Sequence, residues 1–355
     1  MAKNQTPTQN NNVSAPKKND KKKVALALQG GGAHGAFTWG VLDRLFEDGR
    51  FEIEGLSGTS AGGMNAVAAA QGLVKGGNQG ARDSLNHFWE KISESSRHSP
   101  LKPGPIDRFQ GKWTMNQSPF FVAFEYMTRM FSPYEFNPFD TNPLRDVVKE
   151  LFDFPLLNKT IFPKVFLAAT HVYTGKVKVF GNEDLKPECV LASACLPFLH
   201  RAVDVDGEFY WDGGFIGNPV LFPLIDNCPT SDIILVRINP ITRRTLPTPA
   251  RDILDRLNEI TSNASMIREM RAIAFITKLI DDGKITDGSL KRLFMHDIAA
   301  EDEFQQLGFS SKLNAEWDFL THLKEVGRNV TDTWIKKNFD KIGKESSGNI
   351  YEEFM

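Results

Sequence analysis

Residues 24–73 read VALALQGGGAHGAFTWGVLDRLFEDGRFEIEGLSGTSAGGMNAVAAAQGL, and the predicted fold follows from their pattern. It begins with the short apolar run VALALQ (24–29), which is typical of a buried strand. Apolar residues then recur at helical spacing over 36–48, and FEIEGLSG (51–58) is a second strand candidate. The small apolar residues of 60–73 suit a tightly packed helix. An alternation of strands and helices predicts a parallel sheet with helices packed against it.

The α/β pattern continues to about residue 240, and helical patterns follow it. KVFLAATHV (164–172) and GKVKVF (175–180) predict paired strands, and DIILVRI (232–238) predicts a buried strand. We therefore predict an α/β fold, in which a mostly parallel central sheet is flanked by helices and followed by a helical C-terminal extension. The helical candidates beyond residue 240 are 251–280, as one stretch or two, 312–326 and 330–342.

The composition is that of an ordinary globular protein. Of the 355 residues, 41% are hydrophobic and 24% are charged, and the net charge is −2. Residues 1–23 hold six lysines and one aspartate, so they carry +5 and leave −7 for the rest. A nucleic-acid binder is usually basic, so no nucleic-acid partner is expected. The three cysteines neither form a disulfide framework nor show the close pairing of zinc ligands, so we expect no metal and no cofactor.

We expect three parts in the chain: a disordered basic tail over 1–23, an α/β domain over 24–240 and a helical region over 241–355. No apolar run approaches the ~20 residues that span a bilayer, and the N-terminus lacks the apolar core of a signal peptide. We therefore expect a cytoplasmic protein. Its basic tail is either a solvated leader or a peripheral contact with the inner face of a membrane.

The first chemical motif is Gly58-Thr59-Ser60-Ala61-Gly62, a G-x-S-x-G between a strand and a helix. A nucleophilic serine needs such a sharp turn, because the turn projects its hydroxyl above the sheet. Flanking glycines let the backbone turn without a Cβ clash. The alternative is a plain Gly-Ser turn in which the serine caps the helix.

The second motif is GGGAHG (30–35), between the first strand and its helix. Consecutive glycines at a helix N-terminus expose backbone N–H groups that cradle an anion. In one interpretation this loop is the oxyanion hole for Ser60. In the other it belongs to a nucleotide-binding protein.

The dinucleotide interpretation rests on spacing. Gly30, Gly32 and Gly35 match G-x-G-x-x-G, and Glu52 and Glu54 lie about twenty residues on, where a ribose-binding acid is expected. Against it, the second strand leads directly into the serine turn, for which a dinucleotide fold has no use.

A serine nucleophile needs a base, and the best candidate is Asp212. It ends a short strand and is followed by Gly213 and Gly214, so its carboxylate is held on a tight turn. The alternative is that Asp-Gly-Gly forms an ordinary hairpin or loop turn. A carboxylate acts as the base directly if its pKa suits. His296 and His322 follow Asp212 in chain order, as a triad histidine does, but both lie in polar helical surroundings.

Taken together, these motifs resemble those of the patatin-like phospholipases. The family's marks are a glycine-rich oxyanion loop, here GGGAHG (30–35), a G-x-S-x-G elbow, here GTSAG (58–62), and a D-G-G or D-G-A, here DGG (212–214). A serine-alanine segment that ends in Leu-Pro appears as SACLP (193–197). The resemblance extends over 24–238 and fixes the order of the motifs as well as their spacing.

The resemblance implies a Ser–Asp dyad without histidine. Ser60 is then the nucleophile and Asp212 the proton acceptor, with the oxyanion hole at Gly30, Gly31 and Gly32, where the N–H groups of the last two stabilise the oxyanion. The implied activity is that of a lipid acyl hydrolase acting on phospholipid or lysophospholipid. The alternatives are a broad carboxylesterase, a polyester depolymerase with the same dyad, a nucleotide-binding protein and an inactive lipid-binding scaffold. The oligomeric state is left open.

One loop residue departs from the family pattern. Many relatives carry Arg or Lys at the position of His34, so cationic help near the loop is not assured. We expect His34 to pack at the start of the helix.

Residues 97–140 differ in texture from the rest and are the candidate lid or cap. Ten aromatic residues lie between 109 and 139, where the chain average of 11% gives between three and four. Such side chains suit an acyl-binding wall or contact with a membrane surface, and they equally suit core packing under a long connection.

Overall fold

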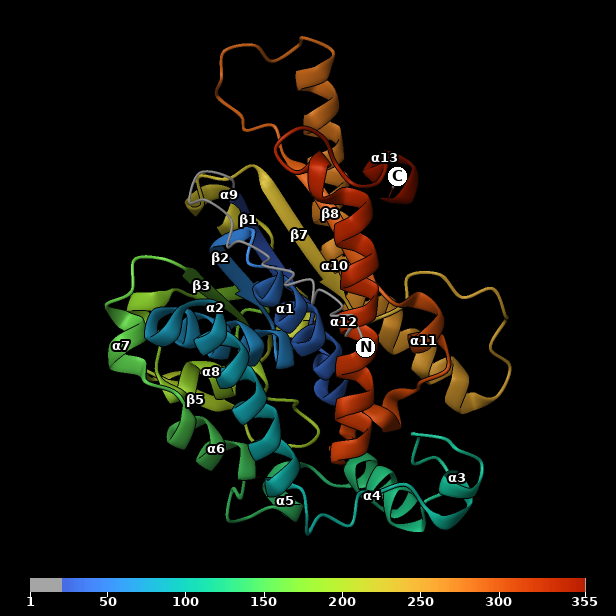
Figure 1. The fold of residues 1–355 in the computed structure, drawn as a ribbon. Coiled ribbons are helices and arrows are strands. Elements are labelled where there is room, and N and C mark those ends of the chain that lie inside the picture. The colour runs from blue at the N-terminus through green and yellow to red at the C-terminus, as the bar shows by residue number, and fades with distance from the viewer. Residues whose placement is uncertain (1–20, 355) are drawn as a thin grey trace, which may run out of the picture.

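A mostly parallel sheet of eight strands forms the centre of the computed structural model, which describes residues 21–354 (Figure 1). The strands are β1 (Lys22–Leu28), β2 (Phe51–Gly58), β3 (Lys164–His171), β4 (Val177–Phe180), β5 (Val203–Val205), β6 (Glu208–Asp212), β7 (Asp232–Arg237) and β8 (Phe294–Ala299). Their order is β5-β6-β3-β2-β1-β7-β8, and β4 also pairs with β3. The run from β3 to β8 is parallel, whereas β4, β5 and β6 are antiparallel to their neighbours.

Helices cover both faces of the sheet, so the predicted fold class is confirmed (Figure 1). The α-helices are α1 (Gly35–Asp48), α2 (Ala61–Ser95), α3 (Pro105–Phe109), α4 (Pro119–Met130), α5 (Pro133–Phe136), α6 (Pro143–Leu151), α7 (Phe154–Asn158), α8 (Pro187–Ser193), α9 (Phe222–Asn227), α10 (Ala250–Asp281), α11 (Glu301–Gln305), α12 (Trp317–Asn338) and α13 (Ile350–Phe354). The 3₁₀ turns are η1 (Gly32–His34), η2 (Asn182–Asp184), η3 (Gly213–Phe215), η4 (Phe309–Leu313) and η5 (Phe339–Lys341).

Alternate side chains of β1 enter two cores, one on each face of the sheet. Val24, Leu26 and Leu28 join a core with side chains of α1, α2 and α12. Ala25 and Ala27 join the other core, with side chains of α9 and α10. A strand that is apolar on both faces is what a central parallel strand requires, which explains the unbroken apolar run of β1.

The strand register brings the chemical motifs to one edge of the sheet. Leu28 pairs with Gly58 on one side and with Val236 on the other, so β1, β2 and β7 end level with one another. In the neighbouring ladder Ala169 pairs with Asp212, which ends β6. Loops at the carboxyl ends of parallel strands are the usual location of an α/β site.

The ordered chain begins earlier than predicted. Lys22 and Lys23 belong to β1: the Lys22 N–H donates to the Arg50 carbonyl at 2.8 Å, and the Lys23 ammonium lies 3.0 Å from the Glu54 carboxylate. These contacts let charged residues extend the apolar strand. The other part of the predicted tail, residues 1–20, lies outside the described residues.

The region after residue 240 is mostly helical, as predicted, but it also contributes a strand. Phe294–Ala299 forms β8 and pairs in parallel with β7 over Asp232–Arg237. The 251–280 stretch is one helix, α10, and α12 covers most of the two later candidates without a break. The boundary near residue 240 thus marks a change of composition, and as a domain border it stays a prediction.

The aromatic-rich segment forms the short helices α3, α4 and α5 along one end of the molecule (Figure 1). Phe121 is buried, whereas Phe109 and Phe139 are 93% and 90% exposed. Core packing therefore does not account for most of these rings. The further exposed aromatic residues of the segment are Phe120, Tyr126, Phe131 and Tyr134. Over residues 21–354, no helix has the length and apolar character that crossing a membrane requires.

Candidate active site

Ser60 occupies a sharp turn between β2 and α2. Its backbone has φ 55° and ψ −125°, in the left-handed half of the map that few non-glycine residues adopt. A Cβ on Gly58 would lie 2.4 Å from the Gly62 carbonyl oxygen, and one on Gly62 would lie 2.2 Å from that of Leu28. Glycine is thus required at both flanks of the elbow. The strained backbone of Ser60 itself is typical of a functional position.

The glycine loop lies directly against the elbow. A Cβ on Gly30 would lie 2.3 Å from the Thr59 carbonyl oxygen and 2.9 Å from the Ser60 Cβ. Asn218 holds Gly30 from the other side: its side-chain oxygen accepts from the Gly30 N–H at 2.6 Å, and its amide donates to the Gly30 carbonyl at 3.2 Å. The Asn239 amide donates to the same carbonyl at 3.2 Å.

Asp212 is brought to the same place by β6. Its side chain is only 3% exposed, and its Oδ1 accepts from the Gly214 N–H at 2.7 Å. Its backbone is fixed as well, since the N–H donates to the Cys195 carbonyl and the carbonyl accepts from the Thr170 hydroxyl, both at 2.8 Å. The carboxylate is therefore held in one orientation.

Burial raises the pKa of Asp212 to about 6, against an ordinary value of 3.8. The Gly214 N–H, the nearby Ser60 side chain and the charge of Lys312 act in the opposite direction and lower this pKa. The result is a carboxylate that is ionised at neutral pH and still basic enough to take a proton.

The serine-alanine segment (193–197) forms hydrogen bonds with both Ser60 and Asp212. The Ser60 N–H donates to the Ser193 hydroxyl at 3.0 Å. The Cys195 carbonyl accepts from the Asp212 N–H, so one short segment orients both candidate catalytic residues.

Sequence reasoning missed the residues that brace the glycine loop. Asn218 lies four residues after Gly214, in Asn218-Pro219, and its closeness to the DGG motif was the available signal. Asn239 and Lys312 carry no local pattern, because they reach the loop only through tertiary contacts. The Lys312 ammonium donates to the Asn239 side-chain oxygen at 2.7 Å.

The two candidate triad histidines are bonded to other carboxylates. His296 contacts Asp232 at 3.0 Å, at the start of β7, and His322 contacts Glu303 at 2.9 Å. Within residues 21–354, neither histidine forms a hydrogen bond with Ser60 or with Asp212.

The acids of the dinucleotide interpretation lie at the wrong end of the sheet. Glu52 is paired in register with Lys23, near the start of β1, whereas the glycine loop follows its other end. Glu54 is buried, contacts Lys23 and accepts from the Thr230 N–H at 2.6 Å. Neither carboxylate faces the loop, which removes the main support for a ribose site.

His34 packs at the start of α1, where its ring contacts Phe304 and Phe319 with centroids 5.3 and 6.2 Å away. Its Nε2 lies 2.8 Å from the Ser311 hydroxyl. Burial, reinforced by the charge of Lys312, lowers the pKa of His34 well below its ordinary value. It therefore supplies no cation at neutral pH.

Arg201, which lies close in sequence to the serine-alanine segment, contacts the aromatic-rich segment. The Arg201 guanidinium lies over the Tyr134 ring, 5.1 Å from its centroid, and donates to the Pro138 carbonyl at 3.0 Å. The Arg201 carbonyl in turn accepts from the Cys195 thiol at 3.0 Å. Arg201 thus connects the aromatic-rich segment with the segment that orients Asp212.

All three cysteines are free thiols and buried. Among residues 21–354, no group of histidine, cysteine and carboxylate side chains is arranged to hold a metal ion.

One of three comparisons with known proteins identifies the family of the chain. The family model described as patatin-like phospholipase matches residues 26–232, more than half of the chain. Among solved structures, the chain is similar to VipD from Legionella pneumophila, with 13% identity and a TM-score of 0.33 over 87% of this chain and 67% of that one. The sequence comparison with curated proteins gives no match. The family match assigns lipid acyl hydrolysis as the general class of activity, and the chain belongs to the patatin-like phospholipase family.

Proposed function

We propose that the chain cleaves carboxylic ester bonds of lipids, in the manner of a phospholipase A or lysophospholipase, through a Ser60–Asp212 dyad. The observation that carries the proposal is the meeting of three features at one edge of the sheet. Ser60 sits on a strained elbow, its side chain lies close enough to the buried carboxylate of Asp212 to lower the pKa of that carboxylate, and the glycine loop lies against the elbow. These are the parts of a nucleophilic hydrolase.

In the first half of the reaction, the Ser60 Oγ attacks the ester carbonyl carbon while Asp212 takes the hydroxyl proton. The carbonyl electron pair moves to the oxygen and forms an oxyanion. When the tetrahedral intermediate collapses, the bond to the leaving alcohol breaks, and Asp212 returns the proton to that oxygen. An acyl-enzyme on Ser60 remains.

In the second half, Asp212 takes a proton from water, whose oxygen attacks the acyl carbon. The bond to the Ser60 Oγ breaks, the proton returns to Oγ, and the carboxylic acid leaves. A carboxylate with a pKa of about 6 suits both halves, because it exchanges protons readily near neutral pH.

The hydrogen bonds of the glycine loop narrow the set of candidate oxyanion donors. The Gly30 N–H is already used by Asn218, so this glycine has a bracing role. Within the described residues, the N–H groups of Gly31 and Gly32 donate to no protein acceptor, and both residues are accessible to solvent. These two groups are the donors in our proposal. A single such donor is worth about 2.7–4 kcal/mol in the transition state.

The aromatic-rich segment supports a lipid as the substrate. Its exposed rings lie on α3, α4 and α5 and on the residues that directly follow α4 and α5, and Arg201 connects α5 with the site. Amphiphilic substrates need an apolar surface beside the reacting groups. We propose that this segment forms the wall or lid for acyl chains and the contact with the lipid surface.

The test is covalent capture of the nucleophile in the full chain. We expect a fluorophosphonate probe to label Ser60, as located by peptide mass spectrometry, and the labelling to disappear in Asp212→Ala. The matched control is Asp206→Ala, which removes an exposed carboxylate from the turn before β6. It should leave labelling unchanged. Labelling that is absent from folded wild type, or that survives Asp212→Ala, would contradict the dyad.

Substrate profiling then separates lipids from other esters. We expect Ser60-dependent release of fatty acid from phospholipid vesicles and from lysophospholipid micelles. Activity restricted to short soluble esters or to polyesters would instead indicate a carboxylesterase or a depolymerase with the same dyad.

A further inference from the structure

A segment from outside the matched family region reaches the glycine loop. The turn η4 (Phe309–Leu313) packs on η1, and a Cβ on Gly32 would lie 2.3 Å from the Lys312 carbonyl oxygen. The same turn supplies Ser311 to His34 at 2.8 Å. The C-terminal region therefore forms one wall of the loop that holds the candidate oxyanion donors.

The side chain of Lys312 runs along this wall. Its Cε lies 3.8 Å from where a Cβ on Gly31 would stand. Its ammonium donates to the Asn239 side-chain oxygen at 2.7 Å, and the Asn239 amide donates to the Gly30 carbonyl at 3.2 Å. Two hydrogen bonds thus connect a cation with the loop backbone, and Asn239 is only 2% exposed.

The charge of Lys312 is not neutralised by a close partner. In the described part of the chain its one hydrogen bond is to a neutral amide, and no ion pair includes it. The carboxylates that act on it from further away are Asp212, Asp255 and Glu259. Burial lowers the pKa of Lys312 from its ordinary value.

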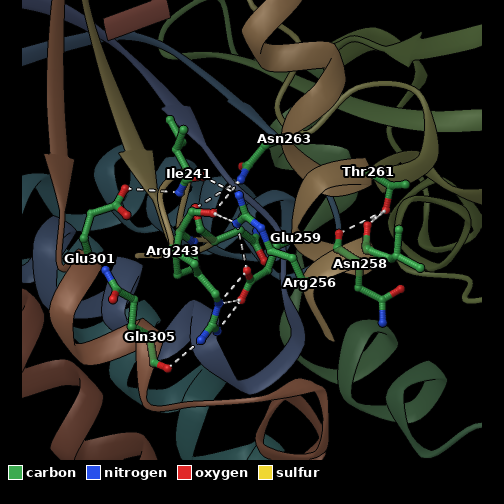
Figure 2. A network of polar contacts seen from close by, with 12 residues as sticks. Ile241, Arg243, Arg256, Asn258, Glu259, Thr261, Asn263, Glu301 and Gln305 are labelled. Carbon is green, nitrogen blue, oxygen red and sulfur yellow. Dashed lines mark hydrogen bonds and ion pairs between the residues drawn. The ribbon is translucent and has the colours of Figure 1, made fainter. Parts of the chain in front are cut away.

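The nearby carboxylates of α10 are engaged elsewhere. Glu259 lies between Arg243 and Arg256, with contacts of 2.8 and 3.1 Å, as Figure 2 shows. Asp255 accepts from the Phe309 N–H at 3.2 Å. On the loop side, His34 is neutral at neutral pH. Among the described residues, Lys312 is thus the cation packed against the glycine loop, and its positive charge also acts on Asp212.

We propose that Lys312 is a positioning residue for the ester hydrolysis, which aligns the glycine loop through Asn239 and sets a positive charge beside the developing oxyanion. The inference rests on the proposed function. A fixed charge in a site with little water stabilises a transition-state anion more than it does in bulk solvent. The same charge favours the ionised form of Asp212, the form that accepts the proton.

The experiment measures kcat/KM against pH for a soluble p-nitrophenyl ester. Lys312→Met keeps the length of the side chain and removes its charge, and Lys312→Arg keeps the charge. The matched control is Lys291→Met, because the Lys291 ammonium is also partly buried and donates to a neutral carbonyl, that of Cys228, at 2.6 Å. Thermal unfolding of each variant is recorded alongside.

We expect Lys312→Met to lower kcat/KM about tenfold, less than the ~10²–10³ loss of a direct oxyanion donor. Its acid limb should move to higher pH, Lys312→Arg should retain most of the rate, and Lys291→Met should match wild type. If Lys312→Met does not fold, Lys312→Gln gives the same comparison with a side chain that still donates to Asn239.

An active wild type whose pH profile is unchanged by neutralising Lys312 would overturn this inference alone. Equal losses in the Met and Arg variants would also overturn it, since the charge would then be irrelevant. A wild type without Ser60-dependent hydrolysis would overturn the proposed function and this inference with it.

Discussion

Asp212 and Arg237 are two charged side chains with the same burial and opposite surroundings. Each is 3% exposed, and each ends a strand of the same sheet, β6 or β7. Three carboxylates surround the guanidinium of Arg237, those of Asp297 at 2.6 Å, Glu301 at 2.5 Å and Glu353 at 3.3 Å. In the described part of the chain, no ion pair includes Asp212.

The difference separates what the fold needs from what the proposed chemistry needs. Burial lowers the pKa of Arg237, but its carboxylates more than offset this and raise it, so the charge is permanent. Burial raises the pKa of Asp212 to about 6, and nothing nearby offsets this fully. A paired charge joins β7 to β8, α11 and α13, whereas an unpaired one is left able to exchange a proton.

The largest expected effect comes from neutralising the unpaired charge. Asp212→Asn keeps the shape of the side chain and removes the base, so kcat/KM should fall by roughly 10²–10⁴-fold. Initial rates on lysophospholipid, with circular dichroism as the check of folding, measure this. Retained activity in a folded variant would contradict the role of Asp212 as the base.

Removing the paired charge should instead damage the fold. Arg237→Met leaves Asp297, Glu301 and Glu353 close together without a cation, and breaking a buried pair costs about 3–5 kcal/mol. Urea denaturation followed by tryptophan fluorescence gives the loss in the free energy of unfolding. The variant molecules that remain folded should still label with a fluorophosphonate, because Arg237 does not touch the site.

Asp212→Asn should at the same time stabilise the protein. The difference between a folded pKa of about 6 and an ordinary value of 3.8 corresponds to about 3 kcal/mol, because the buried carboxylate disfavours the folded state. The sign is that of a raised pKa: the penalty is full above pH 6, decreases as the pH falls through 6, and vanishes below 3.8. Unfolding of both proteins at pH 8 and pH 4 should show a gain that is large at pH 8 and small at pH 4. An equal gain at both would contradict the burial argument.

The same pKa predicts the acid limb of the activity. Asp212 accepts a proton only as a carboxylate, so kcat/KM should be level above pH 7 and lie about tenfold below its plateau at pH 5. A pH profile on a soluble ester, corrected for stability at each pH, checks this. A midpoint near 4 would mean that the carboxylate is better solvated than its burial indicates.

The fold and the two candidate catalytic residues were within reach of the sequence because local geometry dictates them. The elbow requires glycine at 58 and 62, and the close contact with Thr59 requires glycine at 30. Each requirement therefore appears in the sequence as a short local motif. The unbroken apolar run of β1 likewise reports a strand that is buried on both faces.

What the sequence did not predict depends on contacts between distant residues. Lys312 reaches the glycine loop 280 positions away from Gly32, and no local pattern marks a lysine for that role. Strand β8 was missed because His296 and Asp297 interrupt its apolar residues, although His296 is buried against Asp232. The composition also did not predict that Phe109 and Phe139 are exposed, since aromatic clusters are more often buried.

The smallest expected effect is the sharpest test of the comparison, because it applies one substitution to two buried aspartates. Asp232 is 4% exposed, close to Asp212, but its Oδ1 accepts from the His296 ring at 3.0 Å and from the Gly343 N–H at 2.7 Å. Asp232→Asn weakens these charge-assisted bonds and should lower the free energy of unfolding by about 1 kcal/mol at pH 8, with kcat/KM unchanged. Asp212→Asn should raise the free energy of unfolding under the same conditions. Opposite signs would mean that hydrogen-bond and ion-pair partners, and not the depth of burial, decide whether a buried carboxylate of this sheet stabilises the fold or stays able to exchange a proton. Equal signs would mean that the hydrogen bonds of Asp232 with His296 and Gly343 do not account for the difference between the two aspartates.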